Sequence, residues 1–173
     1  MLKLFFATDV HGSETTFRKW LNAAEHYGAD VLLLGGDLTG KMLVPIVEEP
    51  GGGRTARFEG STVRVEGEEE LKNLERGLRQ RGYYTQRMTS EEKAAYQTPE
   101  QVEELFKQHM AEVLQGWVGL ADERLDPGKT PAVWMPGNDD LEFIDPYVNS
   151  SKAIQNSLTQ RSRVGGCGAS VNG

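Results

Sequence analysis

Three short apolar runs along the chain predict buried β-strands. They occupy residues 2–7, 31–34 and 131–135, and each is rich in branched or aromatic side chains. Continuous apolar runs of this kind are typical of parallel strands that are covered on both faces. We therefore expect a sheet whose strands come from both ends of the chain.

A helix is predicted between the first two runs. Ser13 is a favourable N-cap, and residues 17, 20, 21 and 24 are apolar at helical spacing. Gly28 follows where a left-handed residue would end the helix. Strand, helix and strand in this order predict a right-handed βαβ unit with parallel strands.

Residues 41–130 leave this pattern and predict an insertion. Residues 57–65 predict a small hairpin, and an apolar stripe predicts a helix over residues 67–82. The sequence Thr98-Pro99-Glu100-Gln101 predicts the start of a second helix. We therefore expect a mainly helical insertion.

Two roles are open for the insertion. A long insertion beside a site on a rigid scaffold often forms a lid, and Tyr83 and Tyr84 would then contact a substrate. The alternative is an element that serves stability or oligomerisation.

The predicted fold class is α/β, with one domain over residues 1–156. Its core would comprise residues 1–40 and 131–156, with the insertion at 41–130. Residues 157–173 are dominated by Ser, Arg and Gly without an apolar period, which predicts a disordered tail.

Composition limits the classes of partner. The chain has 173 residues, a net charge of -7 and a pI near 5.1, which argue against a broad nucleic-acid or anionic-membrane surface. A phosphate-bearing substrate would have to be attracted by local cations. The single cysteine, Cys167, excludes an internal disulfide, and no apolar run reaches the length of about 18 residues that a membrane span needs. We expect a soluble, cytoplasmic protein.

Each of the three predicted strands ends in residues that carry oxygen or imidazole donors. These residues are Asp9 and His11 after the first strand, Asp37 after the second, and Asn138, Asp139 and Asp140 after the third. Because parallel strands bring their carboxyl ends to one edge, we expect these side chains to converge in a crevice there. Carboxylate and imidazole donors together suit a divalent transition metal. Each motif alone also has an ordinary interpretation as a turn or a surface residue.

Other polar residues have ordinary structural interpretations. His26 falls in the last turn of the first predicted helix, where a cation meets the negative helix end. His109 lies in an apolar stripe, so we expect it to be packed or hydrogen-bonded. The glutamates at 68–70 are interpreted as a solvated helix start.

The ordered set Asp9-x-His11, Gly36-Asp37-Leu38-Thr39-Gly40 and Gly137-Asn138-Asp139-Asp140 resembles the calcineurin-like metallophosphoesterases. The resemblance covers residues 1–40 and 131–147. It implies that Asp9 and His11 bind a first metal, that Asp37 bridges two metals and that Asn138 binds the second. It makes Asp139 and Asp140 the catalytic candidates. Two divalent ions, Mn, Fe or Zn, would polarise a phosphoester substrate and activate water.

The chain also departs from this family. Asp139 stands where the family usually has a histidine, and the later histidine and Gly-His-x-His motif have no counterpart, since the histidines are His11, His26 and His109. The resemblance therefore implies the N-terminal portion of an αββα sandwich that lacks its second sheet. We expect phosphoester hydrolysis that is impaired in a C-terminally incomplete chain. The alternative is a non-catalytic remnant that binds at most one metal and acts as an interaction module. A sheet without its cover also predicts self-association.

Overall fold

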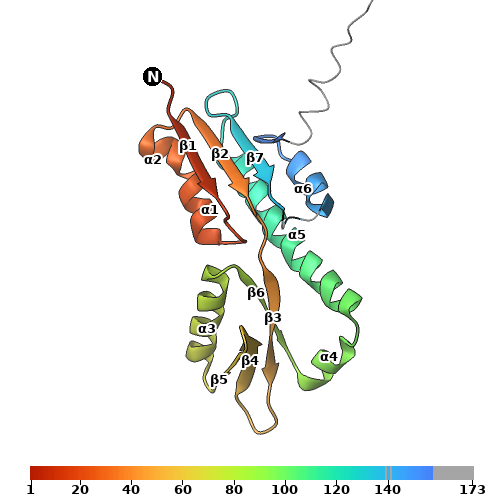
Figure 1. Cartoon of the computed structure of the whole chain (residues 1–173). Helices are drawn as coiled ribbons and strands as arrows, with labels where there is room; N and C mark the ends of the chain where they lie inside the picture. The colour runs from red at the N-terminus through yellow and green to blue at the C-terminus, as the bar shows by residue number, and fades with distance from the viewer. Residues whose placement is uncertain (139, 141, 158–173) are drawn as a thin grey trace, which may run out of the picture.

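The computed structural model describes residues 1–138, 140 and 142–157, and the chain forms two four-stranded sheets (Figure 1). The first sheet has the order β1-β2-β7-β8 and is parallel throughout. Its strands are β1 (Leu4–Thr8), β2 (Val31–Gly36), β7 (Ala132–Pro136) and β8 (Ile154–Asn156). The predicted α/β class and the parallel pairing of β1 with β2 are confirmed.

The predicted helix between β1 and β2 is present but divided. Helix α1 (Glu14–Leu21) begins after Ser13, whose side chain accepts a hydrogen bond from the Thr16 N–H. Asn22 separates it from α2 (Ala23–Tyr27), which ends at Gly28 in the expected left-handed conformation with φ 61°.

Helices hold more of residues 41–130 than strands do, as expected, but this segment also contains a second sheet of which the sequence predicted only a hairpin. Its order is β5-β4-β3-β6, and its strands are β3 (Met42–Glu48), β4 (Arg54–Phe58), β5 (Ser61–Val65) and β6 (Tyr83–Met88). The hairpin of β4 and β5 was predicted, whereas β3 and β6 were not. Pro45 lies within β3 and removes a backbone donor, so this apolar run did not have the pattern of a central strand.

Three helices cover the second sheet. Helix α3 (Glu68–Gln80) packs its buried Leu71 and Leu78 against one face. On the other side lie α4 (Ser90–Ala95) and α5 (Pro99–Arg124), and α5 begins at the predicted cap, where Thr98 and Gln101 exchange hydrogen bonds.

The long helix α5 connects the two halves of the molecule. Figure 1 shows it running from beside the second sheet to the first. Its Leu114 and Trp117 join the core of the first sheet, where Trp117 stacks on Phe17 with ring centroids 4.4 Å apart. A short 3-10 turn (Glu142–Ile144) and α6 (Asp145–Asn149) complete this core.

The helices cover only one face of the first sheet in the described chain. Leu32, Leu34 and Trp134 point into the helical core and are fully buried. The alternate positions form the other face, where Leu4 is 53% and Phe6 52% exposed. These strands are therefore apolar on both faces but buried on one.

Among the described residues, no helix combines the length and the apolar character needed to cross a membrane. The predicted tail lies outside the described residues from residue 158 onward.

Candidate metal centre

Asp9 and His11 lie in a tight loop directly after β1. Both have left-handed backbone conformations, with φ 53° and 47°, and Gly12 follows with φ 70°. Non-glycine residues adopt this conformation at a cost of about 1–3 kcal/mol, and such strain concentrates at functional sites. Because β1 already ends at Thr8, it is this loop and not strand alternation that brings the two side chains together.

The loop after β2 holds the first loop in place through the backbone. The N–H groups of Asp9, His11 and Gly12 donate to the carbonyl oxygens of Gly35, Asp37 and Leu38, at 3.1, 3.0 and 2.8 Å. These bonds continue the pairing of β1 with β2 beyond the ends of the strands. Asp37 is therefore fixed opposite His11 by the sheet itself.

Asp9, His11 and Asp37 form the single group of this kind found among the described residues. One ligand atom from each lies within 4.8 Å of the others, and His11 Nε2 is 4.0 Å from Asp37 Oδ2. Two ligands on one ion are separated by at most about twice the metal–ligand distance of about 2.1 Å, so the His11–Asp37 spacing fits a shared ion.

The environment of the group also fits a metal. His11 Nδ1, the ring nitrogen other than the one that faces Asp37, is buried without a hydrogen-bond partner in the described chain. Asp37 is only 8% exposed, whereas Asp9 is exposed and its carboxylate accepts a hydrogen bond from the Thr8 hydroxyl. Two carboxylates and one imidazole match the donors that Mn²⁺, Fe²⁺ and Zn²⁺ accept.

Two glycines make room for the carboxylates. A Cβ on Gly36 would lie 3.0 Å from Asp9 Oδ2, and a Cβ on Gly137 would lie 2.2 Å from Asp37 Oδ1. Gly137 therefore brings the loop after β7 against Asp37. Asn138 comes next and is exposed, while Asp139 lies outside the described residues.

Asp140 has a different environment from the predicted ligands. Its carboxylate accepts hydrogen bonds from the N–H groups of Leu38, Thr39 and Gly137 and from the Thr39 hydroxyl, at 2.8–3.1 Å. It thus ties the loop after β2 to the loop after β7. These contacts favour a positioning role for Asp140 over the role of a catalytic acid.

Tyr84 is a residue whose contribution the sequence did not reveal. It is 6% exposed, and its hydroxyl accepts a hydrogen bond of 2.9 Å from the Gly40 N–H. Its ring fills the space above both Gly12 and Gly40, where an added Cβ would meet it at 3.0 and 2.8 Å. Burial raises the pKa of Tyr84 to about 12, so the hydroxyl stays neutral.

Tyr84 therefore packs from the second sheet against the two loops that carry the candidate ligands, the loop after β1 and the loop after β2. Through this contact the insertion touches both loops, and the contact of Tyr84 with a substrate stays a prediction. Tyr83 points to the other face of β6, where its hydroxyl donates to Glu59. This hydrogen bond raises the pKa of Tyr83.

The other two histidines lie apart from the metal group. His26 is exposed in α2 beside the Tyr27 ring, and His109 in α5 is hydrogen-bonded to Gln86 at 2.9 Å. Burial lowers the pKa of His109.

A hollow of about 550 Å³ lies next to Asp9 and His11. The second sheet forms its far wall through Lys41, Arg81 and Tyr83, and a Cβ on Gly82 would lie 2.7 Å from the His11 Cβ. The insertion therefore lies at the edge of the first sheet that carries the candidate ligands.

Comparisons with known proteins identify no relative. A scan against models of protein families, a search of curated proteins and a search of solved structures each found no significant match.

Proposed function

We propose that the Asp9–His11–Asp37 group binds one divalent transition metal and that the protein is a metal-dependent phosphoesterase of the calcineurin-like type. The observation that carries the proposal is the convergence of these three side chains from two parallel strand ends. The order of the motifs along the chain supports the same family.

The residues have distinct roles in this proposal. Asp9, His11 and Asp37 hold the ion, while Asp140 and Tyr84 keep the two ligand loops in position. A bound divalent ion supplies Lewis-acid polarisation of a phosphoryl oxygen and lowers the pKa of water. Asn138 would contribute to a second ion, with Asp37 shared between the two.

The first test is the substitution Asp37→Asn. Removing the shared carboxylate should weaken Mn²⁺ binding by about 100-fold or more, because loss of outer-shell partners alone costs about 10- to 100-fold. Calorimetric titration with Mn²⁺ measures this change. Asp126→Asn, at an exposed turn, is the matched control and should bind Mn²⁺ as the unmodified chain does. Equal Mn²⁺ affinity in all three proteins would contradict the assignment.

A second candidate is a non-catalytic module that binds one metal. It is favoured by the positions of His26 and His109, because neither joins the metal group. Turnover of p-nitrophenyl phosphate in the presence of Mn²⁺ distinguishes the two candidates. We expect turnover close to the detection limit, since a second ion would have Asn138 and the shared Asp37 as its protein ligands. Turnover that is lost in Asp37→Asn and retained in Asp126→Asn assigns phosphoester hydrolysis to this site.

A further inference from the structure

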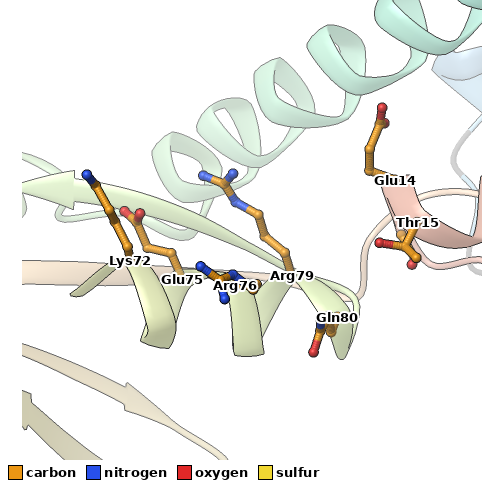
Figure 2. Close-up of a pocket in the computed structure, with 8 residues that line it drawn as sticks. Glu14, Thr15, Lys72, Glu75, Arg76, Arg79 and Gln80 are labelled. Atoms are coloured by element: carbon orange, nitrogen blue, oxygen red, sulfur yellow. The ribbon is translucent and has the colours of Figure 1, made fainter. Parts of the chain in front are cut away.

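Beside the metal-site hollow lies a second hollow of about 400 Å³, between the start of α1 and α3 (Figure 2). Its lining residues are Ser13, Glu14, Thr15, Lys72, Glu75, Arg76, Arg79 and Gln80. Ser13 and Gln80 line both hollows, so the second hollow adjoins the one beside Asp9 and His11. We call the second hollow the α3 groove.

The carboxylates of the α3 groove are already engaged. Glu14 accepts hydrogen bonds from Arg18 and from the Trp117 ring N–H, both at 2.6 Å. Glu75 accepts two hydrogen bonds from Arg87, at 2.7 and 3.0 Å, and this pairing lowers the pKa of Glu75. Both carboxylates thus have hydrogen-bond partners other than the three cations of the groove, and the charge of Arg79 also contributes to the lowered pKa of Glu75.

The cations of the α3 groove are not paired in this way. Lys72, Arg76 and Arg79 form no ion pair with any other residue that the structure describes. Their spacing places them along one side of α3, as Figure 2 shows, with Glu14 and Thr15 across the groove. The groove is thus locally positive in a protein with a net charge of -7.

The helix dipole does not account for this arrangement. Cations are favoured in the last turn of a helix, which explains Arg79. Lys72 and Arg76, however, precede the last turn of α3, so the dipole does not account for their positive charge. A ligand that carries negative charge gives all three side chains a common role.

We propose that the α3 groove binds a second phosphate group of a small substrate whose first phosphate lies at the Asp9–His11–Asp37 group. This inference rests on the proposed function and adds the substrate class: a small molecule with more than one phosphate. Arginine is suited to this task because its guanidinium fork binds two phosphate oxygens at once. The short, locally positive groove fits a small molecule better than nucleic acid, which the net charge repels.

The test is a calorimetric titration of the Mn²⁺-loaded chain with tripolyphosphate and, separately, with orthophosphate, each corrected by the same titration into buffer that contains Mn²⁺ alone. We expect tripolyphosphate to bind about tenfold more tightly, a difference of about 1.4 kcal/mol, and this preference to weaken as salt is added. The triple variant Lys72→Ala/Arg76→Ala/Arg79→Ala should lose the preference. The control Lys19→Ala/Lys129→Ala/Lys152→Ala changes the net charge equally at exposed positions and should retain it. Circular dichroism melts of both variants verify that they are folded.

Three outcomes would overturn the inference. The first is that the unmodified chain binds tripolyphosphate no more tightly than orthophosphate. The second is that both triple variants lose the preference for tripolyphosphate to the same extent. The third is that a short single-stranded oligodeoxynucleotide binds more tightly than tripolyphosphate. The Mn²⁺ titration of Asp37→Asn is a separate measurement, so failure of the metal assignment is distinguishable from failure of the groove.

Discussion

The two sheets of this protein differ in how their faces are covered and in what their strand ends carry. The second sheet has α3 on one face and α4 and α5 on the other, and its strands mix polar and apolar residues. The first sheet has apolar strands, yet within the described chain helices cover only one of its faces. It also carries the candidate metal ligands. The sheet that carries the candidate ligands is therefore the less completely covered one, and the second sheet packs against its ligand-bearing loops.

The second sheet meets the first at the loops that carry the candidate ligands. Tyr84 of β6 contacts Gly12 in the loop after β1 and Gly40 in the loop after β2. Asp140 connects the loop after β2 with the loop after β7 through hydrogen bonds from the Leu38 and Gly137 N–H groups. These two residues allow the contribution of each sheet to the site to be measured separately.

The largest effect is expected for Asp140→Asn, which disturbs the first sheet alone. An amide has one acceptor oxygen and turns its own donors toward the N–H groups of Leu38, Thr39 and Gly137. We expect the free energy of unfolding to fall by about 2–4 kcal/mol, because buried donors lose a charged acceptor. Urea denaturation measures the free energy of unfolding, with Asp126→Asn as the control. If both variants unfold at the same urea concentration, the hydrogen bonds accepted by Asp140 do not stabilise the fold.

Tyr84→Phe tests the support that the second sheet gives to the first. The substitution leaves the buried Gly40 N–H without its acceptor and should cost about 1–3 kcal/mol of stability. Mn²⁺ affinity should fall as well, because the loops that carry His11 and Asp37 lose their support. The control Tyr96→Phe removes a tyrosine hydroxyl at an exposed position after α4 and should leave Mn²⁺ affinity unchanged. Identical Mn²⁺ affinities in the two variants would disprove the supporting role.

The uncovered face of the first sheet predicts self-association. Exposed Leu4 and Phe6 lie together on this face, and large apolar patches on monomers are commonly interaction sites. We expect Leu4→Thr/Phe6→Ser to weaken self-association by about tenfold, which corresponds to about 1.4 kcal/mol. Sedimentation velocity over a concentration series measures the change. Met42→Gln/Val102→Thr removes two exposed apolar side chains elsewhere and serves as the control. A monomeric unmodified chain at all concentrations would contradict the prediction.

The smallest effect concerns His109, on the α5 side of the second sheet. Burial lowers its pKa in the folded chain below the ordinary value of 6.5, with Glu112 opposing and Arg79 reinforcing the shift. The unfolded chain therefore binds more protons below about pH 6.5, and stability should decline as the pH falls through this range. His109→Gln should reduce this decline. Urea midpoints measured between pH 5 and pH 8 provide the test, and parallel curves for the two proteins would contradict it.

The strands of the first sheet could be predicted because their apolar runs are continuous and end in glycine or polar residues. The grouping of Asp9, His11 and Asp37 then followed from the parallel order of the strands. The second sheet could not be predicted in full, since Pro45 interrupts β3 and polar residues occupy half of β6. The contributions of Asp140 and Tyr84 depend on tertiary contacts with residues 44 to 102 positions away, which periodicity does not encode.

The most direct test of the metal assignment is the number of Mn²⁺ ions bound per chain, measured by equilibrium dialysis followed by elemental analysis. The geometry of Asp9, His11 and Asp37 predicts one ion per chain, with the ion lost in Asp37→Asn. Two tightly bound ions per chain, or one ion that remains bound in Asp37→Asn, would contradict the account.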